Sequence, residues 1–206
     1  MEHEIGLIFH NRGLRSYIEV DLCRQCPRQD DKGCCGYYSP VFYLADFAYW
    51  LEKKPDLVDH LFSLPNLTVL DASVTMNSAP EGDSYRCRFH GRENGCFLTQ
   101  ELRESICRHF VCPGINWEVE PHLQHWRLFF EKLGEYEISL NNQMAEIFKE
   151  RGLSLRDPLQ RRELLGHLPG VFHDLTVNST GFLASCPILE EAVIRRPLVY
   201  GKEWRL

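Results

Sequence analysis

Residues 23–36 read CRQCPRQDDKGCCG, and residues 87–112 read CRFHGRENGCFLTQELRESICRHFVC. Together the two stretches hold all but one of the nine cysteines in a chain of 206 residues. Glycines and a proline interrupt the first stretch, which predicts a loop rather than a regular element. The sequence therefore concentrates its thiols in two segments that are well separated along the chain.

The chemistry of these thiols depends on the compartment. The N-terminal residues Met-Glu-His-Glu carry acidic side chains where a secretory signal carries basic ones. No apolar run approaches the roughly 20 residues that span a bilayer. We therefore expect a cytoplasmic protein that does not interact with membranes. Because disulfide frameworks belong mostly to oxidising compartments, we expect clustered thiols to be metal ligands, with disulfides or inert buried thiols as the alternative.

The spacing of the first stretch favours metal binding. Two residues between Cys23 and Cys26 let one turn of backbone aim both sulfur atoms at one ion, as zinc and iron–sulfur sites do. The adjacent pair Cys34-Cys35 is less usual, because successive side chains of an extended chain point to opposite faces. The flanking glycines, at positions 33 and 36, could supply a turn that brings both thiols to one ion. Otherwise the two thiols serve different metal atoms.

The candidate ligands are the eight clustered cysteines, and their order along the chain does not show which of them share a site. They suffice for two four-sulfur sites, for a cluster plus a zinc ion, or for one site with the other thiols buried. His90 and His109 could each replace a thiolate, but we expect both on the surface or behind the ligands. Three arginines are expected to lie next to the ligands without binding the metal, and to adjust the charge around the metal centre. They are Arg24, Arg88 and Arg108. The candidate ligands are Cys23, Cys26, Cys34, Cys35, Cys87, Cys96, Cys107 and Cys112.

Residues outside the clusters offer weaker signals. Cys186 is expected to be a buried apolar thiol. His122, His125, His167 and His173 could form a second site, although a lone histidine on a helix is more often structural.

Charge and missing motifs exclude several function classes. A net charge of −6 argues against nucleic-acid binding, which draws most of its affinity from basic residues. The chain has no Gly-rich phosphate loop, no GxSxG nucleophile motif and no CxxxCxxC motif of the radical S-adenosylmethionine enzymes. The sequence therefore assigns no catalytic residue and leaves open whether the protein is an enzyme.

Hydrophobic periodicity predicts a mixed, mainly helical α+β fold. In this fold a loop-rich, cysteine-ligated metal-binding region at residues 1–115 packs on a helical region at residues 116–206 within one globular unit. Alternation predicts strands within residues 1–22, and a turn is expected at residues 89–95. Further elements are expected as a strand at residues 69–76 and as helices at residues 41–53, 56–62, 99–109 with Thr99 as N-cap, 158–165 and 187–195.

A seven-residue repeat in the second half predicts one long helix, or two helices hinged at Gly134. Glu137 is its one polar exception. We expect its apolar face to pack against the metal-binding half, and a coiled-coil contact is the alternative. The repeat consists of Leu123, Trp126, Phe130, Leu133, Leu140, Met144 and Ile147.

The cysteine pattern resembles the YkgJ-type cysteine-cluster family, the zinc- or iron-chelating domain with a CxxCxxCC pattern. The matching pieces are Cys-Arg-Gln-Cys at residues 23–26, Gly-Cys-Cys-Gly at residues 33–36, the stretch that begins at Cys87, and Cys-Arg-His-Phe-Val-Cys at residues 107–112. The resemblance covers about half of the chain, and the gap between Cys26 and Cys34 is longer than in the compact form. It implies metal chelation, as an iron–sulfur cluster. A related cysteine motif occurs in flagellin lysine methylases, which implies protein modification as one role.

Two hypotheses follow for the function. The first is an iron–sulfur protein, with a 4Fe-4S cluster, that acts in redox chemistry or in modification of a protein substrate. The second is a zinc-binding structural or interaction module without catalysis, whose helical half binds a protein partner. The adjacent Cys34-Cys35 pair favours iron.

Overall fold

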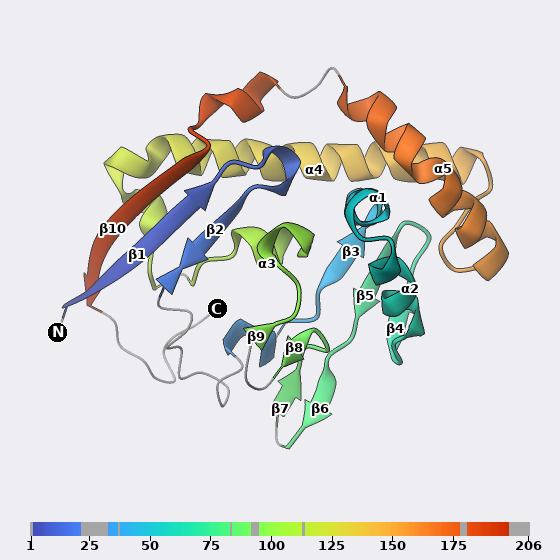
Figure 1. The fold of residues 1–206 in the computed structure, drawn as a ribbon, viewed down its shortest axis with the longest axis horizontal. Coiled ribbons are helices and arrows are strands. Elements are labelled where there is room, and N and C mark those ends of the chain that lie inside the picture. Colours follow the sequence, from blue (N-terminus) through green and yellow to red (C-terminus); the bar gives the residue numbers. More distant parts are fainter. Residues whose placement is uncertain are drawn as a thin grey trace.

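The structure is a computed structural model that describes residues 2–21, 33–36, 38–82, 84–91, 95–112, 114–177 and 181–197 (Figure 1). Short strands and helices fill the first half of these residues, and two long helices dominate the second. The strands are β1 (Glu2–His10), β2 (Tyr17–Val20), β3 (Val41–Tyr43), β4 (Leu67–Val69), β5 (Ser73–Met76), β6 (Ala79–Glu81), β7 (Ser84–Arg86), β8 (His90–Gly91), β9 (Gly95–Cys96) and β10 (Leu189–Pro197). The α-helices are α1 (Leu44–Lys53), α2 (Asp56–Ser63), α3 (Ser105–His109), α4 (Gln124–Glu150) and α5 (Pro158–Thr176). The 3-10 turns are η1 (Gly13–Arg15), η3 (Gly33–Gly36), η4 (Gln100–Leu102), η5 (Trp117–Val119), η6 (Pro121–Leu123) and η7 (Gly181–Ser185).

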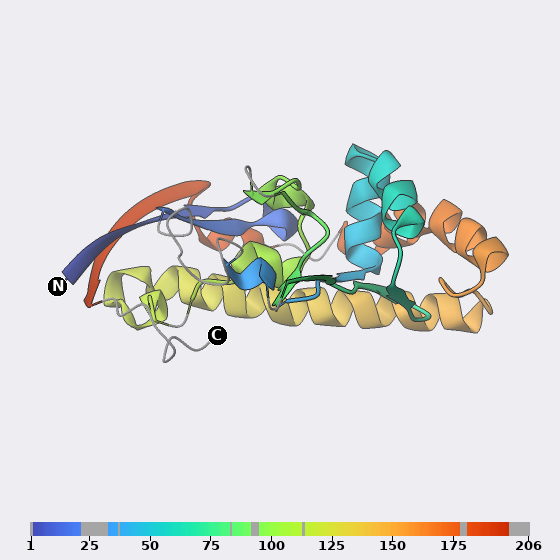
Figure 2. The ribbon, with the colours of Figure 1, turned by 90° about the horizontal axis from the view of Figure 1, so that it is seen from below.

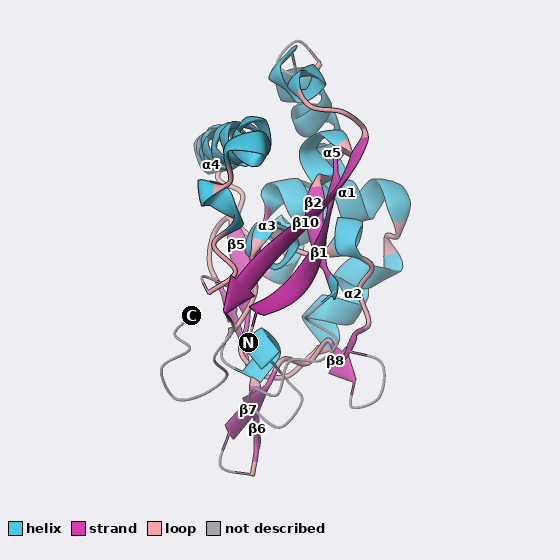
Figure 3. Cartoon of the chain, turned by 90° about the vertical axis from the view of Figure 1, so that its left-hand side faces the viewer, coloured by secondary structure: helices cyan, strands magenta, loops and turns pink. Residues whose placement is uncertain are grey.

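The two ends of the described chain meet in one antiparallel sheet with the order β10-β1-β2. Alternate residues of β1, namely Ile5, Leu7 and Phe9, are fully buried. Phe9 stacks on Trp126 of α4 with ring centroids 5.1 Å apart. The sheet therefore lies on the N-terminal half of α4, which Figures 2 and 3 show from below and nearly along the helix axis.

The strand β10 corrects the sequence-based expectation of a helix at residues 187–195. Its residues pair with β1 from Glu2↔Pro197 to His10↔Leu189. Their burial alternates, with Ile194 buried and Val193 exposed, as expected for a strand with one face on a core. Residues 189–197 form a strand because they pair with β1 at the other end of the chain, and the local sequence does not reveal this partner.

The long helix α4 is continuous, so Gly134 is not a hinge. Its apolar repeat faces its own chain, because Trp126, Leu133 and Met144 are fully buried. The N-terminal half of α4 packs on the sheet, and its C-terminal half packs on α1 and α5. This face is therefore covered within the chain, which excludes it as a coiled-coil contact.

A second region forms around α1, α2, α5 and the sheet with the order β3-β5-β4. The expected strand at residues 69–76 is a hairpin, in which Val69 of β4 pairs with Val74 of β5. The expected helix at residue 158 begins there and continues to Thr176, capped by Asp157. Both hydrophobic clusters contain residues from each side of residue 115. The combination of α-helices with antiparallel sheets confirms the mixed helix-and-sheet fold class.

Membrane-crossing segments are a separate question. Among the residues with assigned positions, no helix combines the length and the apolar character needed to cross a bilayer.

Candidate metal centre

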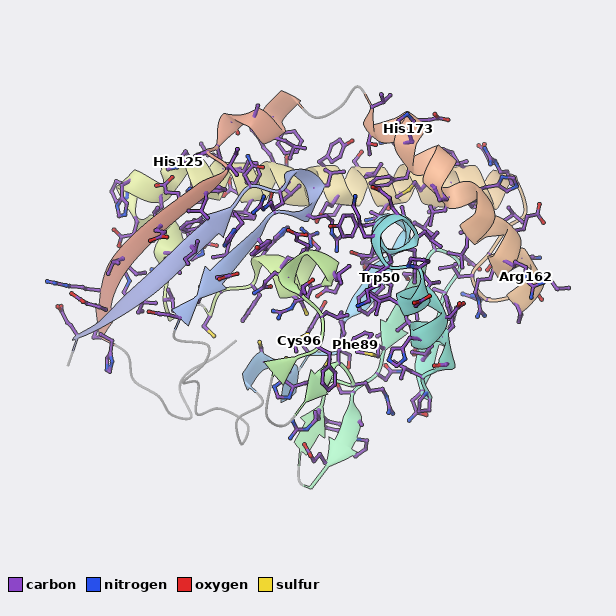
Figure 4. All side chains as sticks on the ribbon, viewed as in Figure 1. Trp50, Phe89, Cys96, His125, Arg162 and His173 are labelled. Carbon is purple, nitrogen blue, oxygen red and sulfur yellow. The ribbon has the colours of Figure 1, made fainter. Side chains whose placement is uncertain are left out.

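Five of the candidate ligands lie on short elements that gather beside α3. Cys34 and Cys35 belong to η3, Cys87 follows β7, Cys96 lies in β9 and Cys107 lies in α3. The backbone N–H of Cys87 donates to the carbonyl of Cys35 at 2.8 Å, which fixes η3 against the end of β7. Figure 1 shows these elements on the same side of the molecule, and Figure 4 labels Cys96 among them. The fold thus brings together thiols from both cysteine-rich stretches.

The adjacent cysteines occupy a single 3-10 turn, Gly33–Gly36. Successive side chains of such a turn are about 120° apart instead of opposed, because it has three residues per turn. The thiols of Cys34 and Cys35 are hydrogen-bonded to each other. Gly33 and Gly36 stand at the two ends of this turn. The Cys34-Cys35 sequence therefore does not by itself require two metal atoms.

A tight hairpin carries Cys96. In it His90 of β8 pairs with Cys96 of β9, and the N–H of Phe97 donates to the carbonyl of Phe89 at 2.7 Å. The ring of Phe89 is buried against Phe42, with centroids 6.0 Å apart. Strands β8 and β9 lie at the two ends of the turn expected at residues 89–95, and residues 92–94 lie outside the described residues. Phe89 anchors this cysteine to the hydrophobic core.

The element that carries Cys107 begins later than the sequence suggests. The expected helix at residues 99–109 is a 3-10 turn at Gln100–Leu102 followed by α3 at Ser105–His109. Thr99 makes no capping hydrogen bond. Instead, the carboxylate of Glu104 accepts from the N–H groups of Ile106 and Cys107, at 2.9 and 2.7 Å. Glu104 therefore orients the first turn of α3 and, with it, Cys107.

Electrostatic coupling links the five thiols. The hydrogen bond from Cys35 lowers the pKa of Cys34 to about 7, and Arg103 contributes in the same direction. That hydrogen bond, burial, and the charges of Cys34, Cys87 and Cys96 raise the pKa of Cys35. Burial raises the pKa of Cys87 to about 11, and the charges of Cys96 and Cys34 add to the effect.

Cys107 belongs to the same electrostatic group. Burial is the main cause that raises the pKa of Cys107, and the neighbouring carboxylate of Glu104 and the charges of Cys87 and Cys34 add to it. Ionising Cys34 therefore raises the pKa of Cys35, Cys87 and Cys107. A cation placed among them would remove this penalty.

The remaining candidate ligands differ from these five. Cys23 and Cys26 lie outside the described residues. Cys112 is half-buried and packs against the cluster of the sheet and the N-terminal half of α4, whereas Cys35 and Cys96 pack against the other hydrophobic cluster. In the part of the chain that the structure describes, no group of three or more His, Cys, Asp or Glu side chains is arranged so that it could hold a metal ion. The five thiols are gathered but do not form a finished ligand set.

His109 and His125 are held by neighbouring side chains, whereas His173 is exposed. His109 is hydrogen-bonded to Arg108, and burial holds its pKa well below its usual value. His125 pairs with Glu190 at 2.7 Å at the start of α4. Figure 4 shows that this residue lies far from His173, which is exposed on α5. The four histidines of the proposed second site therefore do not converge.

The arginines differ from the sequence-based expectation. Arg24 lies outside the described residues, and Arg88 donates to the carbonyl of Asn77. Arg108 is committed to a buried ion pair with Glu137. Arg103, which the sequence analysis did not single out, is the arginine whose charge lowers the pKa of Cys34. Arg103 lies between Glu101 and Glu104 in the sequence, and this local pattern does not mark it as a neighbour of Cys34.

Cys186 is buried as expected, and its thiol donates to the carbonyl of His125 at 3.5 Å, next to the sheet. It therefore lies outside the group of five thiols and provides a matched control for them.

Comparison with known proteins adds nothing to this assignment. No protein-family model matches the chain, and no curated protein or solved structure matches it significantly.

Proposed function

We propose that this chain binds a metal through the thiolates of its clustered cysteines, as an iron–sulfur protein with a 4Fe-4S cluster. The observation that carries the proposal is that Cys34, Cys35, Cys87, Cys96 and Cys107 come from separate segments and lie on short elements that gather beside α3. Neighbouring thiolates would repel one another, so the raised pKa values keep Cys35, Cys87 and Cys107 protonated until a cation binds and favours their ionised form. A bound metal would explain why these five thiols lie together.

The donor set suits such a centre. Four cysteine thiolates hold a 4Fe-4S cluster, and this group contains enough thiols for one. Reorientation of side chains within the group is required to complete the ligand set. In the proposal Cys23, Cys26 and Cys112 supply the remaining thiols, as a second site or as alternative ligands. Arg103 favours the ionised form of Cys34, and the cluster itself supplies one-electron transfer when it is bound.

The biological role that we propose follows the cysteine pattern. We infer a cytoplasmic protein that acts in redox chemistry or in modification of a protein substrate, as the resemblance to the YkgJ-type family implies. The net charge of −6 and the absence of a basic stretch support a protein partner over a nucleic acid.

One observation favours a second candidate, a structural zinc ion. The η3 turn places the adjacent thiols of Cys34 and Cys35 within hydrogen-bonding contact, so both can turn toward a single ion. Cys87 and Cys96 would complete a tetrahedral four-sulfur site of the kind that structural zinc occupies. In this case the metal organises the loop-rich segments and the protein is an interaction module.

Anaerobic purification followed by metal analysis, sulfide analysis and a visible spectrum separates the two candidates. Iron, acid-labile sulfide and a brown colour support the cluster. Colourless protein with stoichiometric zinc supports the zinc module. Protein that holds neither metal contradicts both.

A further inference from the structure

The strand β10 is an edge of the sheet, because no described strand pairs with its outer side. The N–H of Asn11 donates to the carbonyl of Ile188 at 2.9 Å, which extends the ladder with β1. Backbone groups of an antiparallel strand alternate in direction, so the even-numbered residues of β10 face β1. Glu191, Val193 and Arg195 therefore direct their N–H and C=O groups away from the sheet.

This edge lacks several of the features that usually protect one. Exposed edges are commonly short, bulged or interrupted by proline, because they otherwise pair with other strands. The strand β10 runs for nine residues, and its one proline is the last of them. The side chain of Val193, at its centre, is 65% exposed. The edge is therefore long enough and regular enough to accept another strand.

The charges of β10 are complementary to a second copy of the same strand. Its sequence, LEEAVIRRP at residues 189–197, places two acids before Val193 and two bases after it at equal distances. In an antiparallel pair centred on Val193, Glu191 lies opposite Arg195 of the second copy. Glu191 makes no ion pair with any other described residue, and Arg195 pairs with Glu4 on the exposed surface. Cross-strand pairs of opposite charge stabilise a sheet, and like charges oppose it.

We propose that the chain forms a symmetric dimer through antiparallel pairing of β10 with β10 of a second copy. The two Val193 residues face each other across the symmetry axis and exchange backbone hydrogen bonds. Glu191 and Arg195 form two equivalent ion pairs beside them. The result is one continuous sheet with the strand order β2-β1-β10-β10-β1-β2. The charges of β10 are symmetric about Val193, and this symmetry matches a second copy of β10 and not a strand of unrelated sequence. The sequence of β10 therefore favours a second copy as its pairing partner.

Charge reversal tests the pairing. We expect sedimentation equilibrium under reducing conditions to give a dimer of the full chain. Glu191→Arg and Arg195→Glu should each weaken dimerisation by roughly tenfold, because each places like charges opposite each other twice. A mixture of the two variants should recover the dimer, because every pair in the mixed species is again complementary. A wild-type chain that stays monomeric, or variants that dimerise as tightly as the wild type, would overturn the proposal.

A backbone variant tests the hydrogen bonds. The N–H of Val193 points away from β1, so Val193→Pro removes an outward donor and leaves the internal ladder intact. We expect a folded monomer by circular dichroism and sedimentation. Val193→Thr keeps the N–H and should remain a dimer. A Val193→Pro chain that dimerises normally would also overturn the proposal, and an unfolded one leaves the charge-reversal mixture as the deciding test.

Discussion

The guanidinium of Arg108, on α3, forms a buried ion pair with the carboxylate of Glu137 in the middle of α4. The hydroxyl of Ser105 donates to the same carboxylate, and Arg108 also donates to the carbonyls of Leu14 and Ser16, at 3.1 and 2.9 Å. One buried side chain thus joins α3 to α4 and to the segment before β2. Because α3 carries Cys107, this ion pair helps to position one of the proposed ligands.

Replacing Glu137 with glutamine should destabilise the protein strongly. The variant keeps the volume of the side chain but leaves the buried guanidinium of Arg108 without a counter-charge, which costs about 3–5 kcal/mol. Urea unfolding followed by circular dichroism measures the loss. Glu135→Gln, at an exposed position of the same helix, should change the free energy of unfolding by less than about 0.5 kcal/mol. Equal unfolding midpoints for the two variants would contradict this role.

The start of α3 can be tested by comparing two caps. Glu104→Ala removes the acceptor for two backbone N–H groups and should cost about 1–2 kcal/mol, the range for loss of an N-cap. Thr99→Ala removes no capping hydrogen bond, so its cost should stay within about 0.5 kcal/mol. Thermal unfolding of both variants is the measurement, and a larger loss for Thr99→Ala would favour the helix boundary expected from sequence.

His10 should make stability depend on pH. Both ring nitrogens of His10 are buried without a hydrogen-bond partner, and burial lowers its pKa from the usual 6.5 although Glu19 acts in the opposite direction. The unfolded chain therefore binds a proton near pH 6.5 that the folded chain does not yet bind. Stability should fall as the pH drops below 6.5.

The variant His10→Phe isolates this effect. It preserves the stacking on Tyr17, whose ring centroid lies 4.2 Å from that of His10, and removes the titrating nitrogens. We expect a shallower loss of stability than in the wild type as the pH falls below 6.5, and a gain of about 1 kcal/mol from removal of unpartnered polar atoms. Parallel pH profiles of unfolding for the two proteins would disprove the assignment.

Metal retention should distinguish the clustered thiols from Cys186. Cys87→Ser removes a proposed ligand. Loss of a side chain that only supports a metal ligand lowers metal affinity by roughly 10- to 100-fold, so loss of Cys87 itself should lower the affinity further. Cys186→Ser removes a buried thiol of the sheet region and should leave the metal content unchanged. Metal per chain after chelator challenge is the readout. Equal retention by both variants would mean that Cys87 is not a ligand.

Local sequence predicted the elements whose packing is local. The alternation of Ile5, Leu7 and Phe9 predicted β1, and the repeat through Trp126 and Met144 predicted α4, because each pattern reflects one buried face. The glycines around Cys34 and Cys35 likewise predicted a turn. In each case the residues that decide the structure are neighbours in the sequence.

Features that depend on distant partners could not be predicted in this way. The strand β10 depends on β1, which lies almost the whole chain away. Arg108 was expected to tune the metal centre, but its partner Glu137 lies on another helix. Glu137 was visible only as a polar exception in an apolar repeat, which was the one sequence signal of the buried ion pair. Eight cysteines were expected as candidate ligands, but the sequence did not show which of them share a site. Packing gathers five of them beside α3 and places Cys112 against the other hydrophobic cluster.

X-ray absorption at the metal edge, on protein purified without oxygen, tests the central claim most directly. If thiolates from both cysteine-rich stretches bind one centre, the iron or zinc should be surrounded by sulfur, with metal–sulfur distances of about 2.3 Å. Cys96→Ser should reduce the sulfur content of that shell or remove the metal. A shell of oxygen and nitrogen alone, or protein without iron and zinc, would contradict the account.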